Sequence, residues 1–158
     1  MNWLAKLFGG ISGREPEAKP SAVQQKAPSQ NVRKLRVVGK GGYPRDAVGE
    51  SNYQEALSRV CGGHNRHGHE LTTTGVLMPE PTNPYDPNAI MVTIGGERVG
   101  YLARDEAKRY GDALVAAGFG GQSATVDVKV VGGWRTNQHD EGHFGVKLAL
   151  PWPVKFEH

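Results

Sequence analysis

One short stretch of this sequence brings together side chains whose types could bind a ligand. Residues 83–88, Asn-Pro-Tyr-Asp-Pro-Asn, set the aromatic ring of Tyr85 beside the carboxylate of Asp86, and the basic Arg104 follows further along the chain. A ring stacks on planar groups, a carboxylate accepts hydrogen bonds, and a guanidinium binds anions. These three side-chain types suit a ligand that has a base, a hydroxyl group and a phosphate.

The same residues also have a purely structural interpretation, which stays open at this point. Asn, Pro and Asp are favoured turn residues, so Asp86 is suited to cap its own loop. Tyr85 could cover the end of a β-sheet, and Arg104 could be a solvated surface charge. We expect a turn here in either case, with ligand binding as an added role.

A second stretch holds potential metal ligands, namely Cys61, His64, His67 and His69. Their spacing matches no standard zinc pattern, in which two short pairs are separated by a longer loop. The sequence therefore predicts neither a metal site nor a cofactor. A metal-dependent nuclease that uses His64, His67 and His69 remains the enzymatic alternative.

Periodic patterns predict the elements that would position these side chains. A capping box, Ser51 with Gln54, predicts the start of a helix that ends at Gly62 and Gly63, with Tyr53 on its buried face beside Ala56, Leu57 and Val60. Asp105 is predicted to cap a second helix, with Ala107, Tyr110, Leu114 and Ala117 inside and Gly118 at its end. The predicted strands are 35–38, 47–48, 71–78, 89–94, 98–102, 124–130 and 144–150, with Gly95 and Gly96 as a hairpin turn.

This order of elements predicts a mainly β fold with two helices, in the α+β class. Because a flat sheet of short strands would leave edges that need protection, we expect a small OB-like closed barrel of about six strands with the helices as plugs. Trp134 falls in a loop between the last two strands, where it could be a stacking platform or a plug.

Composition and charge divide the chain into two parts. Residues 1–40 hold eight Lys and Arg against two Asp and Glu, whereas residues 41–158 hold 11 against 14. We predict a basic, largely disordered leader at 1–34, with a short amphipathic segment at 1–11 that could bind a protein partner, and a folded domain at 35–158. No apolar run is long enough for a membrane span, and the single Cys61 suits a reducing, cytoplasmic location.

Three segments together resemble the HIRAN domain. They are Val48-Gly49-Glu50-Ser51-Asn52-Tyr53, the stretch Asn83-Pro84-Tyr85-Asp86-Pro87-Asn88-Ala89-Ile90, and Val99-Gly100-Tyr101-Leu102-Ala103-Arg104. The resemblance implies a modified OB-like barrel that binds DNA and, in some members, captures the 3′ end of a single strand. It places a stacking ring at Tyr85, an acceptor for the free 3′-hydroxyl at Asp86 and a phosphate contact at Arg104. Six positions become candidate DNA-binding residues: Tyr85, Asp86, Arg104, Tyr101, Tyr53 and Asn52.

The chain departs from the pattern of strand-end binders at one place. Ser51 and Asn52 stand where such domains carry a basic residue and an extra aromatic residue, so one cation and one ring are missing. No phosphate-binding loop of the GxxxxGK[ST] type is present, which excludes a claim of ATP-driven remodelling. We therefore expect a non-enzymatic module for single-stranded DNA or DNA 3′ ends in repair or processing, with a protein-interaction adaptor as a further alternative.

Overall fold

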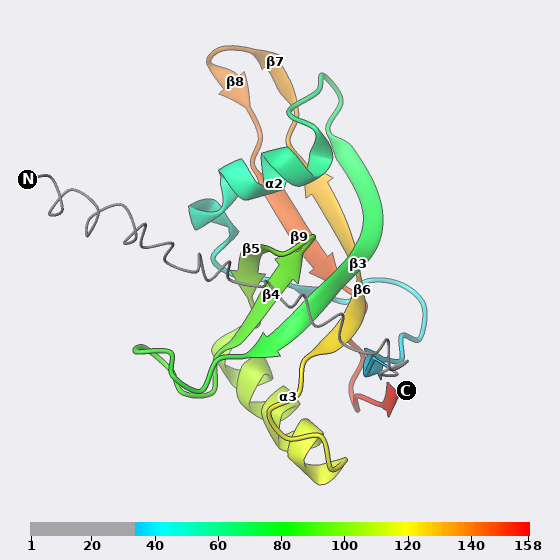
Figure 1. The fold of residues 1–158 in the computed structure, drawn as a ribbon. Helices are drawn as coiled ribbons and strands as arrows, with labels where there is room; N and C mark the ends of the chain where they lie inside the picture. Colours follow the sequence, from blue (N-terminus) through cyan, green and yellow to red (C-terminus); the bar gives the residue numbers. More distant parts are fainter. Residues whose placement is uncertain (1–33) are drawn as a thin grey trace, which may run out of the picture. The chain divides into compact units, whose positions relative to one another are not determined.

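The computed structural model describes residues 34–158. The predicted leader, including the amphipathic segment at 1–11, lies outside the described residues except for Lys34. Within the described part, the chain forms ten strands, two α-helices and one 3₁₀ turn, and the α-helices separate three runs of strands (Figure 1). The helical elements are η1 (Glu50–Asn52, a 3₁₀ turn), α2 (Gln54–Cys61) and α3 (Arg104–Ala116). The strands are β1 (Arg36–Val37), β2 (Arg45–Asp46), β3 (His69–Pro79), β4 (Ile90–Ile94), β5 (Glu97–Tyr101), β6 (Ala124–Gly132), β7 (Arg135–Asn137), β8 (Asp140–Glu141), β9 (Phe144–Leu148) and β10 (Phe156–Glu157).

Eight of the strands form one curled sheet, and β7 and β8 form a separate hairpin. The main path runs β10-β1-β6-β3-β4-β5, and β9 pairs with both β6 and β2. All pairs are antiparallel except β1 with β6. The long strand β3 pairs with β6 over residues 69–77 and with β4 over residues 75–79. It therefore connects the histidine loop with the loop that follows Pro79.

The sheet is an open half-barrel, so the predicted closed barrel of about six strands is wrong, while the mainly β class with two helices is confirmed. No ladder joins β5 to β2. The segment after β2 reaches β5 only through an isolated bridge, in which the backbone amides of Val48 and Tyr101 each donate to the other residue's carbonyl, at 2.8 and 3.0 Å. A short β2 and a single bridge cannot supply the extended pairing that closure requires.

Helix α2 forms where predicted, but it begins differently. Its N-cap is Tyr53, and no side chain caps it, so the predicted capping box at Ser51 and Gln54 is wrong. The Gln54 side chain instead binds the backbone of Phe144, donating to its carbonyl at 3.0 Å and accepting from its amide at 2.8 Å. Gln54 therefore attaches α2 to strand β9. The helix ends as predicted at Gly62, which takes a left-handed φ of 77°.

Helix α3 also begins without a side-chain cap. Its N-cap is Ala103, so Asp105 lies inside the first turn, where its charge suits the positive end of the helix dipole. Ala107, Tyr110 and Leu114 are buried as predicted. Ala117, the C-cap residue of the helix, is exposed, so its predicted place on the inner face is wrong.

The core lies inside the curl of the sheet, with α2 and α3 towards opposite ends (Figure 1). Strand β6 alternates between buried and half-buried positions, and β9 does the same, which confirms the predicted two-residue period. This packing fixes the strand ends from which the site is built. Among the described residues, no helix has the length and apolarity that a membrane span requires.

Candidate nucleic-acid interface

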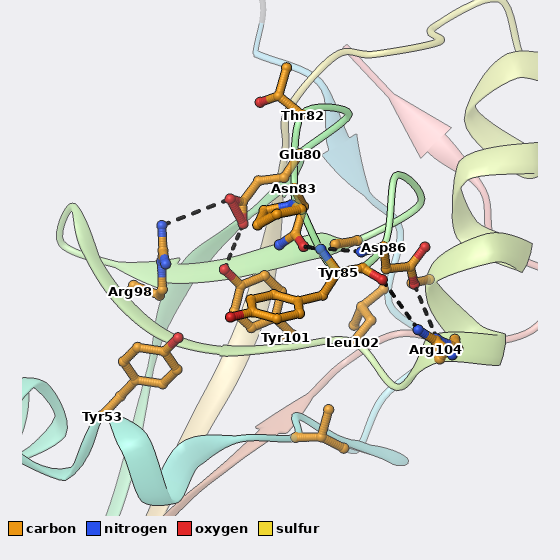
Figure 2. A pocket seen from close by; sticks show the side chains of 14 residues that line it. Tyr53, Glu80, Thr82, Asn83, Tyr85, Asp86, Arg98, Tyr101, Leu102 and Arg104 are labelled. Atoms are coloured by element: carbon orange, nitrogen blue, oxygen red, sulfur yellow. Dashed lines mark hydrogen bonds and ion pairs between the residues drawn. The ribbon is translucent and has the colours of Figure 1, made fainter.

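A hollow of about 590 Å³ lies where the loop after β3, strand β5 and the start of α3 meet. Five of the six candidate residues line it, and Figure 2 shows their side chains around one opening. Glu80, Asn83, Arg98 and Leu102 are among its other lining residues. The structure therefore brings together three segments that lie far apart in the sequence.

The turn at residues 83–88 holds Tyr85 in solvent. The side-chain Oδ1 of Asn83 accepts hydrogen bonds from the backbone amides of Tyr85 at 2.9 Å and Asp86 at 3.1 Å. Tyr85 is 88% exposed, so its ring is not part of the core. Because the turn fixes its backbone and leaves its ring in solvent, Tyr85 is available for stacking on a ligand.

Asp86 uses one carboxylate oxygen for the turn and directs the other towards Arg104. Oδ1 accepts a hydrogen bond from the Asn88 amide at 2.9 Å, which confirms the expected turn role. Oδ2 lies 3.6 Å from Nε of Arg104, too far for a hydrogen bond, and the side chain is 18% exposed. Oδ2 therefore retains acceptor capacity at the surface of the hollow.

Arg104 is the first residue of α3 and stands at the Asp86 side of the hollow. Its side chain is 80% exposed, and Nη2 donates to the Tyr85 carbonyl at 3.4 Å. These contacts are long, and the guanidinium has five N–H donors. Most of its donors remain free for an anion.

Tyr101 belongs to a group of polar side chains at the other side of the hollow. Its hydroxyl donates to Oε1 of Glu80 at 2.6 Å, and the guanidinium carbon of Arg98 lies 5.7 Å from the centre of its ring. Partial burial and the hydrogen bond to Glu80 raise the pKa of Tyr101, so the phenol keeps its proton at neutral pH.

The first of the three segments reaches the hollow because Gly100 has no side chain. A Cβ at Gly100 would lie 3.0 Å from the Val48 carbonyl oxygen, in the bridge that joins Val48 to Tyr101. Tyr53 follows this bridge, and its ring centre lies 6.5 Å from that of Tyr101. Tyr53 is half-buried and lines the hollow, so the expectation that it belongs to the buried face of α2 is wrong.

Asn52 is the one candidate that does not line this hollow. It is exposed and faces a neighbouring hollow of about 430 Å³ over the start of α2, whose lining also includes Tyr53 and Arg59. Tyr53 lines both hollows, so the two hollows lie next to each other at that residue.

Glu80 and Arg98 line the hollow without having been predicted. The pattern of β5 gives a reason for Arg98: in a regular strand, residues 98 and 101 point to opposite faces. The ladder to β4 skips Val99, because Val92 pairs with Gly100 and Thr93 pairs with Arg98. This bulge puts Arg98 and Tyr101 on the same face. No signal in the sequence marks the bulge.

The histidine segment lies elsewhere and serves the packing of β9. His64 and His69 contact the ring of Phe144, at 4.9 and 5.6 Å between ring centres. Nε2–H of His69 donates to the Gly63 carbonyl at 2.8 Å, and Asn65 donates to its Nδ1 at 3.3 Å. In residues 34–158 no group of three or more His, Cys, Asp or Glu side chains is arranged to hold a metal ion.

Trp134 also lies away from the hollow. It is half-buried at the base of the β7–β8 hairpin, where Asn65 bridges to it and Gly142 packs directly against its indole. A Cβ at Gly142 would overlap the indole ring, so the tight packing depends on glycine. Of the two roles that the sequence left open, this placement matches the plug.

Comparison with protein families gives one match. Residues 60–127 match the family model of the HIRAN domain, a range that contains the second and third of the three segments and excludes the first. No curated protein and no solved structure was found to match the chain. HIRAN domains are DNA-binding modules that are generally not catalytic. The turn at residues 83–88 and the strand end at 99–104 thus belong to the matched region, and the chain contains a HIRAN domain.

Proposed function

We propose that the hollow binds single-stranded DNA at a free 3′ end, in DNA repair or processing, without catalysing a reaction. The observation that carries this proposal is the set of free groups in one opening. Three groups line the same hollow: Tyr85, which is 88% exposed, the 80% exposed guanidinium of Arg104, and Oδ2 of Asp86, which within residues 34–158 forms a long ion pair with Arg104 at 3.6 Å. Each matches one part of a terminal nucleotide.

Tyr85 supplies the contact to a base. Stacking of a base on an aromatic side chain contributes about 1–3 kcal/mol and tolerates any base, because every base has a π-face. Tyr101 and Tyr53 add further rings on the same opening, at 6.5 Å from each other. The proposed site therefore prefers unpaired strands without reading sequence.

Asp86 supplies the selection for an end. The 3′ oxygen of a terminal nucleotide carries a proton that Oδ2 can accept, whereas the same oxygen inside a strand carries a phosphate. A phosphate next to this carboxylate would be repelled, since like charges at close range are unfavourable even at the surface. Arg104, 3.6 Å from Oδ2, then meets the phosphate that precedes the terminal sugar.

The proposal is tested by the dissociation constants of three labelled ligands, measured by fluorescence anisotropy at one salt concentration. They are an oligothymidine with a 3′-hydroxyl, the same strand with a 3′-phosphate, and a blunt duplex. We expect the 3′-hydroxyl strand to bind at least about tenfold more tightly than either of the others, in line with a charge-assisted hydrogen bond. Equal affinity for the 3′-hydroxyl and 3′-phosphate strands would contradict end recognition.

A further inference from the structure

Each of the two ends of the hollow holds one carboxylate and one arginine. At one end, Asp86 and Arg104 face each other. At the other end, Arg98 lies among Glu80, Tyr101 and Tyr53 (Figure 2). Tyr85 lines the same opening, so a ligand that occupied the whole hollow would meet an arginine at each end.

Arg98 is held in place and still has free donors. Its Nε donates to the sulfur of Met91 at 3.0 Å, and one terminal nitrogen lies 3.8 Å from Glu80. The guanidinium also lies over the ring of Tyr101, at 5.7 Å from the ring centre. The side chain is nevertheless 46% exposed. An arginine that is fixed in this way loses little conformational entropy when it binds a phosphate.

The repulsion between Glu80 and an anion at this end is weaker than that of a carboxylate without partners. One of its oxygens accepts the Tyr101 hydroxyl at 2.6 Å, and the other lies 3.8 Å from Arg98. Both oxygens thus face donors of the same group. The net charge of Glu80 with Arg98 is zero, and the free N–H groups of Arg98 supply the local attraction.

We propose that Arg98 binds a phosphate on the 5′ side of the one that Arg104 contacts, so that the strand runs from Asp86 past Tyr101 and leaves the hollow over Tyr53. This inference rests on the proposed function, because a 3′-terminal sugar at Asp86 leaves only the 5′ direction for the chain. The strand then continues towards the hollow over the start of α2, which shares Tyr53 and contains Arg59. Arg98 thereby supplies from strand β5 a cation that the segment of Ser51 and Asn52 lacks.

The test combines protein variants with single neutral linkages in the DNA. Wild-type protein, Arg98→Gln and Arg104→Gln are measured against an oligothymidine with a 3′-hydroxyl and against strands in which one phosphodiester at a time is a methylphosphonate. We expect Arg98→Gln to weaken binding of the unmodified strand about fivefold to tenfold. In Arg98→Gln, a methylphosphonate at the linkage that Arg98 contacts should cause no additional loss of affinity, whereas in the wild type it should weaken binding. The linkage that behaves in this way with Arg98→Gln should lie farther from the 3′ end than the one that does so with Arg104→Gln. The slope of log affinity against log salt concentration should fall by about 0.7.

Two control variants separate this contact from general effects of charge and folding. Arg36→Gln removes an exposed arginine that pairs with Asp127 at 3.2 Å outside the hollow, and it should leave all affinities unchanged. Arg98→Lys keeps the charge and should keep the salt dependence. The inference would be overturned if the effect of Arg98→Gln added fully to that of every methylphosphonate. It would also be overturned if the non-additive linkage lay nearer the 3′ end than the linkage found for Arg104. If Arg98 couples as expected while 3′-hydroxyl and 3′-phosphate strands bind equally, the phosphate contact holds and end recognition fails.

Discussion

Two regions of this molecule hold clusters of potentially reactive side chains, and they differ in how far the packing of the fold uses those side chains. In the hollow beside β5, Tyr85 and Arg104 are exposed, and the contact that Oδ2 of Asp86 makes in the described part of the chain is a long ion pair with Arg104, at 3.6 Å. In the histidine segment, the ring nitrogens of His69 are both hydrogen-bonded and His64 packs on Phe144. Residue types alone therefore do not distinguish a site from a packed loop; the freedom of the polar atoms does.

The largest effect should come from the aromatic ring at the centre of the histidine region. Phe144→Ala removes a side chain that is 2% exposed and supports both histidines, so we expect a loss of about 3–5 kcal/mol in the free energy of unfolding. Urea denaturation followed by circular dichroism measures this loss. The folded fraction should keep its affinity for single-stranded DNA. A weaker affinity per folded molecule would mean that the histidine region takes part in binding.

The opposite behaviour is expected for the hollow. Tyr85→Ala should weaken binding of a 3′-hydroxyl strand by about 1–3 kcal/mol, because one stacking contact is lost. The urea midpoint should change little, since this side chain contributes almost nothing to the core. Anisotropy and denaturation on the same preparation measure both quantities. Unchanged affinity would remove Tyr85 from the proposed site.

A smaller, pH-dependent effect is expected at the β7–β8 hairpin. The hydrogen bond from Arg135 at 2.7 Å lowers the pKa of Glu141. A carboxyl whose pKa is lower in the folded state contributes stability above its unfolded pKa and loses that contribution as the pH falls through the folded pKa. The stability difference between wild type and Glu141→Gln should therefore be present at neutral pH and vanish in acid. A difference that is constant over this range would refute the assignment.

The smallest effect is expected from the exposed histidine of the loop. His67→Ala should change neither stability nor DNA affinity, because the side chain is exposed and the hydrogen bond that His67 forms with Asn65 uses its backbone amide. Wild-type protein and this variant should also leave a labelled strand intact when incubated with divalent metal ions. Cleavage that disappears in the variant would support the metal-dependent nuclease alternative.

Local pattern predicted most elements of the fold, and it failed where distant segments decide the outcome. The alternation in β6 and the glycine that ends α2 depend on neighbours in the chain, so they could be predicted. Gln54 was assigned to a local cap, but it binds the backbone of Phe144, which is remote in sequence. Closure of the sheet depends on how far β2 pairs, and no sequence pattern encodes that length.

The candidate site was predictable from the sequence to a similar degree. Five candidates meet in one hollow because three recognisable segments carry them. Asn52 became a candidate because it lies in the first of these segments, but in the structure it faces the adjoining hollow. Arg98 could not be predicted, since the bulge at Val99 reverses the face on which a regular strand would present it.

We propose that the Asp86 carboxylate selects an unblocked 3′ end, and the variant Asp86→Asn separates this selection from the other contacts in the hollow. The asparagine keeps one oxygen for the turn and puts an amide NH2 donor where Oδ2 stood, so it removes both the acceptor for the 3′-hydroxyl and the charge that repels a 3′-phosphate. The measured quantity is the ratio of the dissociation constants for 3′-phosphate and 3′-hydroxyl strands, in wild type and variant. We predict that this ratio falls towards one in the variant, because the 3′-hydroxyl strand binds less tightly and the 3′-phosphate strand binds more tightly. An unchanged ratio would contradict the account.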